Sequence, residues 1–265
     1  MPLKIFVVEH LDYIYKRLVD KFDRENGRYL ALEKPKDAES RIRNYLTKKD
    51  LKGLNSFLER AGWQDEIFHK EYEPLYRYLA NKKITIFCHE NQEYFEDWTF
   101  LRDFLHSECL GVPAYETFKE YIEATEKRNR ASADNIKDIT KKYKINVLYV
   151  ESGVIHAGFI AEILKELGFD VYLLIPKNVR MELVSEEVIK CLKLGINSGR
   201  FEEYVNIFRK QARILEKHGI WRYQRVNLKL YKEIRDKKIR EFPLILDIYR
   251  KFFGEFFRRN RIDFY

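Results

Sequence analysis

The sequence lacks any run of about twenty consecutive apolar residues, the length that a membrane-spanning helix needs. Its first ten residues, "MPLKIFVVEH", contain only a short apolar stretch that ends in charged side chains. This stretch is too short for the apolar region of a secretory signal peptide. The sequence therefore predicts a cytoplasmic protein without a membrane partner.

Cysteine is scarce, and the usual cysteine motifs are missing. No pair has the CxxC spacing of a metal site or a redox pair, because the three cysteines lie far apart, at Cys88, Cys109 and Cys191. Free cysteine behaves as a small hydrophobe when it is buried. We therefore expect all three to be core residues.

Two families of catalytic motif are also absent. Ser152 lies in "ESGVIH" and not in the GxSxG sequence that surrounds many nucleophilic serines. Gly153 and Gly158 belong neither to GxGxxG nor to GxxxxGK(S/T), the glycine-rich sequences that bind nucleotide phosphates. These absences disfavour nucleophilic serine catalysis and phosphate-loop nucleotide binding.

Glutamine occurs only four times, whereas charged residues make up 35% of the chain. This bias is typical of proteins from very hot habitats. The formal net charge is +8, from 50 basic and 42 acidic residues. Because the two signs are mostly interspersed, the pattern favours solvated helical faces over a surface for nucleic acid.

The chain does contain a regular alternation of short apolar segments and amphipathic ones. Five segments have the apolar, β-branched character of buried strands: 3–9, 28–33, 84–89, 145–151 and 170–176. Others have helical spacing, among them 12–22, 56–63, 73–80, 115–143 and 158–168. The alternation predicts an α/β fold with a mainly parallel sheet of about five strands and flanking helices.

Two connections between predicted strands are longer than one crossover helix needs. We expect them to carry an inserted helical cap, at about 36–80 and 92–143, on an α/β core that spans residues 1–176. No strand is predicted after Pro176, and residues 177–265 are expected to form a C-terminal helical region packed on the core. One of its helices has an apolar stripe typical of a core or homodimer face: Ile245, Ile248, Tyr249, Phe252, Phe253, Phe256 and Phe257.

Side chains that bind metals or move protons gather at the ends of the predicted strands. They are Glu9, His10, Glu33, His89, Glu90, Glu151 and, shortly after the fourth strand, His156. The functional crevice of an open parallel sheet lies beyond the carboxyl ends of its strands, where these side chains could converge. Imidazole and carboxylate are ligands of Zn²⁺, Mn²⁺, Co²⁺ and Fe²⁺, and an open coordination position activates water.

Each of these residues also has a structural interpretation. Polar side chains end strands where the sheet meets water, and Glu9 or Glu33 could accept a backbone N–H of the following helix. The sequence "CHENQEYFEDW" is compatible with a loop in which Asn91 caps the next helix, which weakens the assignment of His89 and Glu90. The other histidines fall on helical stretches and are expected to be structural: His69, His106 and His218.

Several of these residues belong to short elements with a specific order. Gly153 to His156 form a Gly-x-x-His sequence between a strand and a helix, "EKRNRASADNI" places Arg128 and Asn129 side by side, and "LALEKP" contains Glu33. These elements resemble those of the superfamily that includes the TraB and Tiki proteins, the erythromycin esterase-like proteins and the ChaN-like haem-binding lipoproteins. The resemblance extends from residue 3 to about residue 176.

Two positions depart from the pattern of that superfamily. Val7 stands where the glycine of the first element belongs, although Glu9 and His10 are present in "VVEH". Ser132 stands where the helix of the superfamily usually has methionine.

The resemblance implies a cleft lined by Glu9, His10, Glu33, Arg128 and His156. It also implies a hydrolase of peptide or ester bonds, with a peptide or a small molecule as substrate. His10, Glu33 and His156 would hold a divalent ion such as Mn²⁺, Co²⁺ or Zn²⁺. Arg128 would bind a carboxylate or a developing oxyanion.

Two alternatives remain open at this stage. The first is a non-catalytic protein of the same fold that contacts nucleic acid or a protein partner through its basic C-terminal segment, "WRYQRVNLKLYKEIRDKKIR" at 221–240. The second is a haem or ligand carrier in which His10 or His156 is an axial ligand.

Overall fold

A computed structural model of the chain describes residues 2–8, 12–63, 69–94, 115–175 and 261–264. The chain divides into two compact units. The first unit comprises Met1–Glu96, Glu126–Asn178 and Asn260–Tyr265, and the second comprises Asp97–Thr125 and Val179–Arg259. Nearly all the described residues belong to the first unit, which contains the candidate site.

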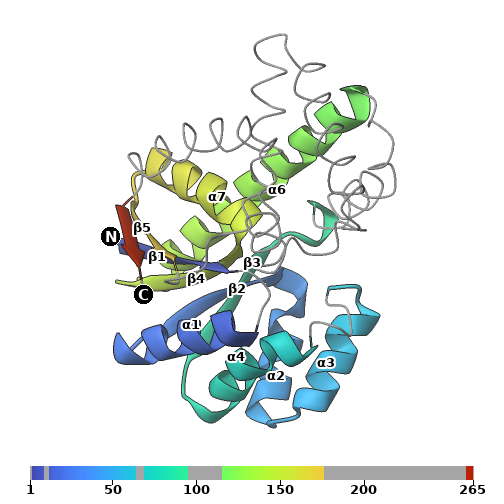
Figure 1. Cartoon of the computed structure of the whole chain (residues 1–265), viewed down its shortest axis with the longest axis vertical. Coiled ribbons are helices and arrows are strands. Elements are labelled where there is room, and N and C mark those ends of the chain that lie inside the picture. Colours follow the sequence, from blue (N-terminus) through green and yellow to red (C-terminus); the bar gives the residue numbers. More distant parts are fainter. Residues whose placement is uncertain (1, 9–11, 64–68, 95–114, 176–260, 265) are drawn as a thin grey trace, which may run out of the picture. The chain divides into compact units, whose positions relative to one another are not determined.

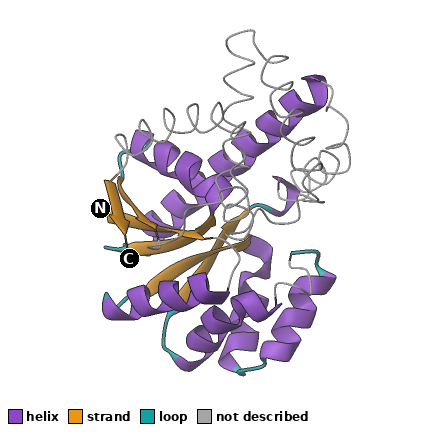
Figure 2. Ribbon diagram, viewed as in Figure 1, coloured by secondary structure: helices purple, strands orange, loops and turns teal. Residues whose placement is uncertain are grey.

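The first unit is built on a six-stranded parallel sheet with the strand order β3-β2-β4-β1-β5-β6. Figure 1 labels β1 to β5, and Figure 2 shows the strands in orange between two layers of helices. The strands are β1 (Pro2–Val8), β2 (Tyr29–Pro35), β3 (Thr85–Glu90), β4 (Leu148–Gly153), β5 (Asp170–Ile175) and β6 (Arg261–Phe264). β4 lies between β1 and β2, and β3 is the next neighbour of β2. The carboxyl ends of β2, β3 and β4 therefore meet at one edge of the sheet.

Helices cover both faces of this sheet (Figure 1). One face carries α1 (Asp12–Arg24), α2 (Glu39–Thr47), α3 (Leu51–Arg60) and α4 (His69–Asn81), with the short 3-10 helix η1 (Lys36–Ala38) before α2. The other face carries α7 (Val154–Glu166) and residues 126–142 of α6 (Tyr115–Lys142). Because both faces are covered, the strands are almost continuously buried, as in β4, where all six residues are buried.

The predicted α/β fold with a mainly parallel sheet is confirmed. All five predicted strands are present, with bounds that differ from the prediction by no more than three residues. α7 begins directly after β4, at Val154 rather than at 158, and Gly153 is its N-cap. His156 therefore lies in the first turn of a helix and not in a separate turn. The insertion after β2 carries α2, α3 and α4; its role as a cap stays a prediction.

The prediction that no strand follows Pro176 is wrong. Near the C-terminus, Arg261–Phe264 form β6, which pairs in parallel with β5 at the edge of the sheet. This segment is only four residues long, "RIDF", and has too few apolar residues to show a strand pattern. Ion pairs with distant residues accompany the backbone pairing: Arg261 Nη1 lies 2.8 Å from Asp170 Oδ1, and Lys21 Nζ lies 2.8 Å from Asp263 Oδ2.

Other predictions for the C-terminal region lie outside the described residues. They concern the apolar stripe at 245–257, the basic segment at 221–240 and the expected burial of Cys191. Cys109, which precedes this region, is also outside the described residues. Cys88, by contrast, is buried in β3 as expected. In the part of the chain that the structure describes, no helix is both long enough and apolar enough to cross a membrane.

Candidate functional site

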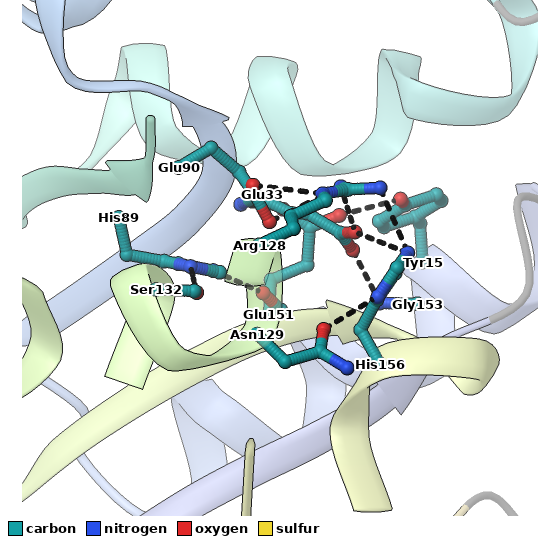
Figure 3. Close-up of polar contacts among 10 residues, drawn as sticks. All are labelled: Tyr15, Glu33, His89, Glu90, Arg128, Asn129, Ser132, Glu151, Gly153 and His156. Atoms are coloured by element: carbon teal, nitrogen blue, oxygen red, sulfur yellow. Dashed lines mark hydrogen bonds and ion pairs between the residues drawn. The ribbon is translucent and has the colours of Figure 1, made fainter. Parts of the chain in front are cut away.

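Three glutamates lie at or near the carboxyl ends of adjacent strands: Glu33 on β2, Glu90 on β3 and Glu151 on β4. Arg128 of α6 and His156 of α7 lie among them (Figure 3). None of these five residues is more than 8% exposed. Burial of ionisable groups is costly unless they are paired, so their partners decide what the site can do.

Arg128 contacts two of the glutamates and the histidine at once. Its Nε donates to Glu90 Oε2 at 2.9 Å and its Nη2 to Glu90 Oε1 at 3.1 Å, which makes a bidentate pair. Nη2 also donates to Glu33 Oε1 at 2.9 Å, and Nη1 donates to His156 Nε2 at 2.8 Å. The planar guanidinium thereby fixes the relative positions of side chains from three elements.

The contact with Arg128 determines the tautomer of His156. A guanidinium can only donate hydrogen bonds, so Nε2 of His156 accepts and carries no proton. The proton of the neutral ring is then on Nδ1, which donates to Asn129 Oδ1 at 2.7 Å. In this arrangement His156 is uncharged, and both of its ring nitrogens have partners.

Glu33 is poised to gain or lose a proton near neutral pH. Burial raises the pKa of Glu33 to about 7, even though the positive charge of Arg128 acts in the opposite direction. The backbone N–H of Gly153 donates to Oε2 of Glu33 at the start of α7. A Cβ atom at position 153 would lie 3.2 Å from that same oxygen, so glycine allows the helix to approach the carboxyl group closely.

Glu151 supports the backbone of Glu33 from the neighbouring strand. Its Oε2 accepts the backbone N–H of Glu33 at 3.0 Å, and its Oε1 accepts the hydroxyl of Tyr15 on α1 at 2.8 Å. Burial and, after it, the nearby Glu151 raise the pKa of Tyr15, so its hydroxyl stays protonated and donates. Glu151 therefore links helix α1 on one face of the sheet to the position of Glu33.

His89 holds β3, β4 and α6 together beside this cluster. Its Nε2 lies 2.9 Å from the backbone carbonyl oxygen of Glu151 and must donate to it. Its Nδ1 then accepts the hydroxyl of Ser132. Burial lowers the pKa of His89, in agreement with a neutral ring. Ser132, the residue that replaces methionine in the pattern described above, thus has a partner of its own.

The structure brings together three of the five residues predicted to line the site. Oε1 of Glu33 and Nε2 of His156 lie 4.0 Å apart, and Arg128 donates to both. Glu9 and His10 lie outside the described residues, so their part in the site stays a prediction.

Glu90 contributes more to the site than the sequence suggested. β3 continues through Glu90, which forms the bidentate pair with Arg128. Asn91 nevertheless acts as the expected cap, because its Oδ1 accepts the backbone N–H of Glu93 at 3.0 Å. Glu90 therefore ends the strand, and the next residue, Asn91, caps the helix that follows.

Two further residues of the cluster had little or no sequence signal as site residues. Asn129 was matched only as the neighbour of Arg128, yet its side chain orients His156. Tyr15 lies on an ordinary amphipathic helix, 136 residues before its partner Glu151. Local patterns cannot show a contact between residues so far apart in the chain.

The divalent ion expected from the sequence would need His10, Glu33 and His156 as ligands. Among the described residues, no group of three or more His, Cys, Asp or Glu side chains could hold a metal ion. The nearest atoms of Glu33 and His156 both accept hydrogen bonds from Arg128, so a cation at this point would meet a positive guanidinium. The described pair therefore does not fit a cation in this arrangement, and the ion stays a prediction.

Comparison with known proteins gives no match by sequence: no family model matches the chain, and neither does any curated protein. Among solved structures, the type III effector HopBA1 is 11% identical with a TM-score of 0.43, over 68% of this chain and 79% of that one. ChaN of Campylobacter jejuni, described as binding haem cofacially, is 13% identical with a TM-score of 0.43, over 68% and 83%. A Bacillus cereus protein is 11% identical with a TM-score of 0.38, over 66% and 65%. Similarity at this level carries no inference about activity.

Replacement of Arg128 is expected to destabilise the protein strongly. Arg128→Met leaves the buried carboxyl groups of Glu33 and Glu90 without their guanidinium partner, a loss of about 3–5 kcal/mol in the free energy of unfolding. Arg130→Met is the matched control on the same helix: the Arg130 side chain is 55% exposed and its Nη2 lies 3.7 Å from Glu166 Oε2. The control should lose less than about 1 kcal/mol in urea denaturation. Equal stability of the two variants would contradict the role of Arg128.

The raised pKa of Glu33 predicts a specific dependence of stability on pH. The folded protein holds a proton on Glu33 up to about pH 7, whereas an unfolded chain loses it near pH ~4.3. This group therefore stabilises the fold fully below about pH 4.3, and its contribution is lost as the pH rises to about 7. Between pH 5 and pH 8, wild type should lose more unfolding free energy than Glu33→Gln, by on the order of 2 kcal/mol. Parallel pH profiles of the two proteins in urea denaturation would show that Glu33 titrates normally.

Proposed function

We propose that this protein is a hydrolase of ester or peptide bonds, with a site centred on Glu33, Arg128 and His156. The observation that carries the proposal is a buried carboxyl group with a pKa of about 7, beside a guanidinium and a neutral imidazole. Apolar side chains of similar volume often stabilise a fold as well as a buried ionic network does, so stability alone is a poor reason for such a cluster. Ionisable groups with perturbed pKa values gather at functional sites.

Glu33 is the general base of the proposed reaction. When the pKa of a base lies near the working pH, a large fraction of the base is unprotonated, and the base still binds a proton strongly enough to take it from water. Each carboxylate oxygen has two lone pairs, so the bonds from Arg128 and Gly153 leave acceptor capacity for a water molecule. Glu33 would take a proton from this water as the water attacks the carbonyl carbon of the substrate. It would then pass that proton to the alcohol or amine as the C–O or C–N bond of the tetrahedral intermediate breaks.

Arg128 is the group that stabilises negative charge in the proposed reaction. As the carbonyl oxygen becomes an oxyanion, a fixed cation in a buried site lowers its energy more than one in water would. Arg128 is held in place by Glu90 through two hydrogen bonds and by His156 through one. Glu90 and His156 are thus positioning residues for the guanidinium, and His156 is itself held by Asn129.

No step of this proposal runs through a metal ion, since the described atoms that would bind one accept hydrogen bonds from Arg128. Catalysis by these residues alone should survive removal of metals. The opposite result would be loss of all activity on dialysis against EDTA and its recovery with Mn²⁺, Co²⁺ or Zn²⁺. That result would favour the metal-assisted reaction expected from the sequence.

The test is the hydrolysis of p-nitrophenyl butyrate and of a quenched fluorescent peptide mixture by the full-length protein. Glu33→Gln should lower kcat/KM by roughly 10²–10⁴, the usual contribution of a general base. The matched control is Glu162→Gln, which changes an exposed glutamate on α7 and should leave kcat/KM unaltered. In wild type, kcat/KM should rise with pH around the pKa of Glu33, about 7. No hydrolysis by wild type, or full activity in Glu33→Gln, would refute the proposal.

A further inference from the structure

We propose that the side-chain amide nitrogen of Asn129 binds the carbonyl oxygen of a neutral substrate, an ester or an amide. This inference rests on the proposed hydrolase, because it names the substrate class for the same site. It starts from the position of Asn129, which follows Arg128 on α6 and lies beside His156 (Figure 3).

The orientation of the Asn129 amide follows from a chain of donors and acceptors. Arg128 can only donate, so His156 accepts at Nε2 and donates from Nδ1. The atom of Asn129 that faces Nδ1 must therefore be the carbonyl oxygen and not the nitrogen. The amide cannot be reversed without two donors facing each other. Nδ2 is consequently a donor with a fixed direction, away from His156.

The nitrogen so oriented is buried without a hydrogen-bond partner among the described residues. Asn129 is 2% exposed, and Nδ2 carries two N–H groups. The hydroxyl of Ser152, at the end of β4, is also buried without a partner among these residues. Buried polar groups without partners are rare, because each costs about 1–3 kcal/mol of lost hydration. A ligand that accepts a hydrogen bond would relieve this cost.

Asn135, on the same helix, shows the contrast. Its Nδ2 donates to the backbone carbonyl of His89 at 3.0 Å, and its Oδ1 accepts Lys36 Nζ at 3.0 Å. Both ends of the Asn135 amide thus have partners, whereas the amide nitrogen of Asn129 has none among the residues that the structure describes.

The charges around Asn129 favour a neutral ligand over an anion. On the side of Asn129, Arg128 already shares its charge between the buried carboxyl groups of Glu33 and Glu90. Lys34 follows Glu33 on β2 and lies over the ring of Tyr72 on α4, 4.2 Å from its centroid. Because α4 and α6 cover opposite faces of the sheet, this contact holds Lys34 on the face away from Asn129. Among the described contacts, a carboxylate would meet two carboxyl groups that share a single guanidinium, whereas the oxygen of an ester or amide carries no net charge.

The direct test is a titration followed by the NMR signals of the asparagine side chains in ¹⁵N-labelled full-length protein. N-methylacetamide is the neutral carbonyl probe, and sodium acetate is the anionic one. We expect the side-chain NH₂ signals of Asn129 to shift saturably with N-methylacetamide and not with acetate, while those of Asn135 stay in place. No saturable shift with N-methylacetamide, or a shift with acetate alone, would overturn the inference. This measurement needs neither a variant nor turnover.

A second test uses the hydrolysis of p-nitrophenyl butyrate. Asn129→Asp keeps an oxygen for Nδ1 of His156 but replaces the donor nitrogen with an acceptor, so kcat/KM should fall by roughly tenfold or more. Asn135→Asp is the matched control and should stay within about twofold of wild type, since its side chain meets only protein groups. An Asn129→Asp variant with unchanged kcat/KM would refute the binding role while leaving the hydrolase intact. If wild type hydrolyses nothing, the proposed function fails and the NMR titration alone decides the role of Asn129.

Discussion

The contacts of the Arg128 guanidinium with Glu33, Glu90 and His156 set the chemistry of this site. Arginine is always charged and can only donate, so every atom that faces it must accept. Glu90 is held as a bidentate acceptor, Glu33 through one oxygen, and His156 in a single neutral tautomer. The orientation of Asn129 follows from that tautomer. One side chain thus fixes the hydrogen-bonding roles of four others without reference to a ligand.

This arrangement depends on the parallel sheet and on close approach at one glycine. Because β2, β3 and β4 are adjacent and parallel, Glu33, Glu90 and Glu151 reach the same edge although they are far apart in the chain. α7 starts at the residue after β4 without an intervening loop, and Gly153 brings a backbone N–H to Glu33. The balance between burial, which raises the pKa of Glu33, and Arg128, which lowers it, then places that pKa near neutrality.

The sequence predicted the sheet and part of this site, for identifiable reasons. Strands buried on both faces give continuous apolar runs, and the residues that end them are visible as polar interruptions; Glu33 was found in this way. His156 was found in the same way, shortly after the fourth strand, and also through its Gly-x-x-His motif. Arg128 was found only through a short motif that resembles one of a known superfamily. Tyr15 could not be found, because its contact with Glu151 joins residues far apart in the chain, and β6 was too short to carry a pattern. Local sequence also could not show that Arg128 donates hydrogen bonds to both Glu33 and His156. These two residues were expected to bind a metal ion, but in the structure they accept hydrogen bonds from the guanidinium.

The central claim is that the Arg128-centred cluster holds Glu33 ready to exchange a proton near neutral pH. The most direct measurement is a ¹³C NMR titration of the side-chain carboxyl carbon of Glu33 in the full-length protein, assigned by the loss of its signal in Glu33→Gln. The structure predicts a midpoint near pH 7. A midpoint close to ~4.3, the value of an unperturbed glutamate, would contradict the account.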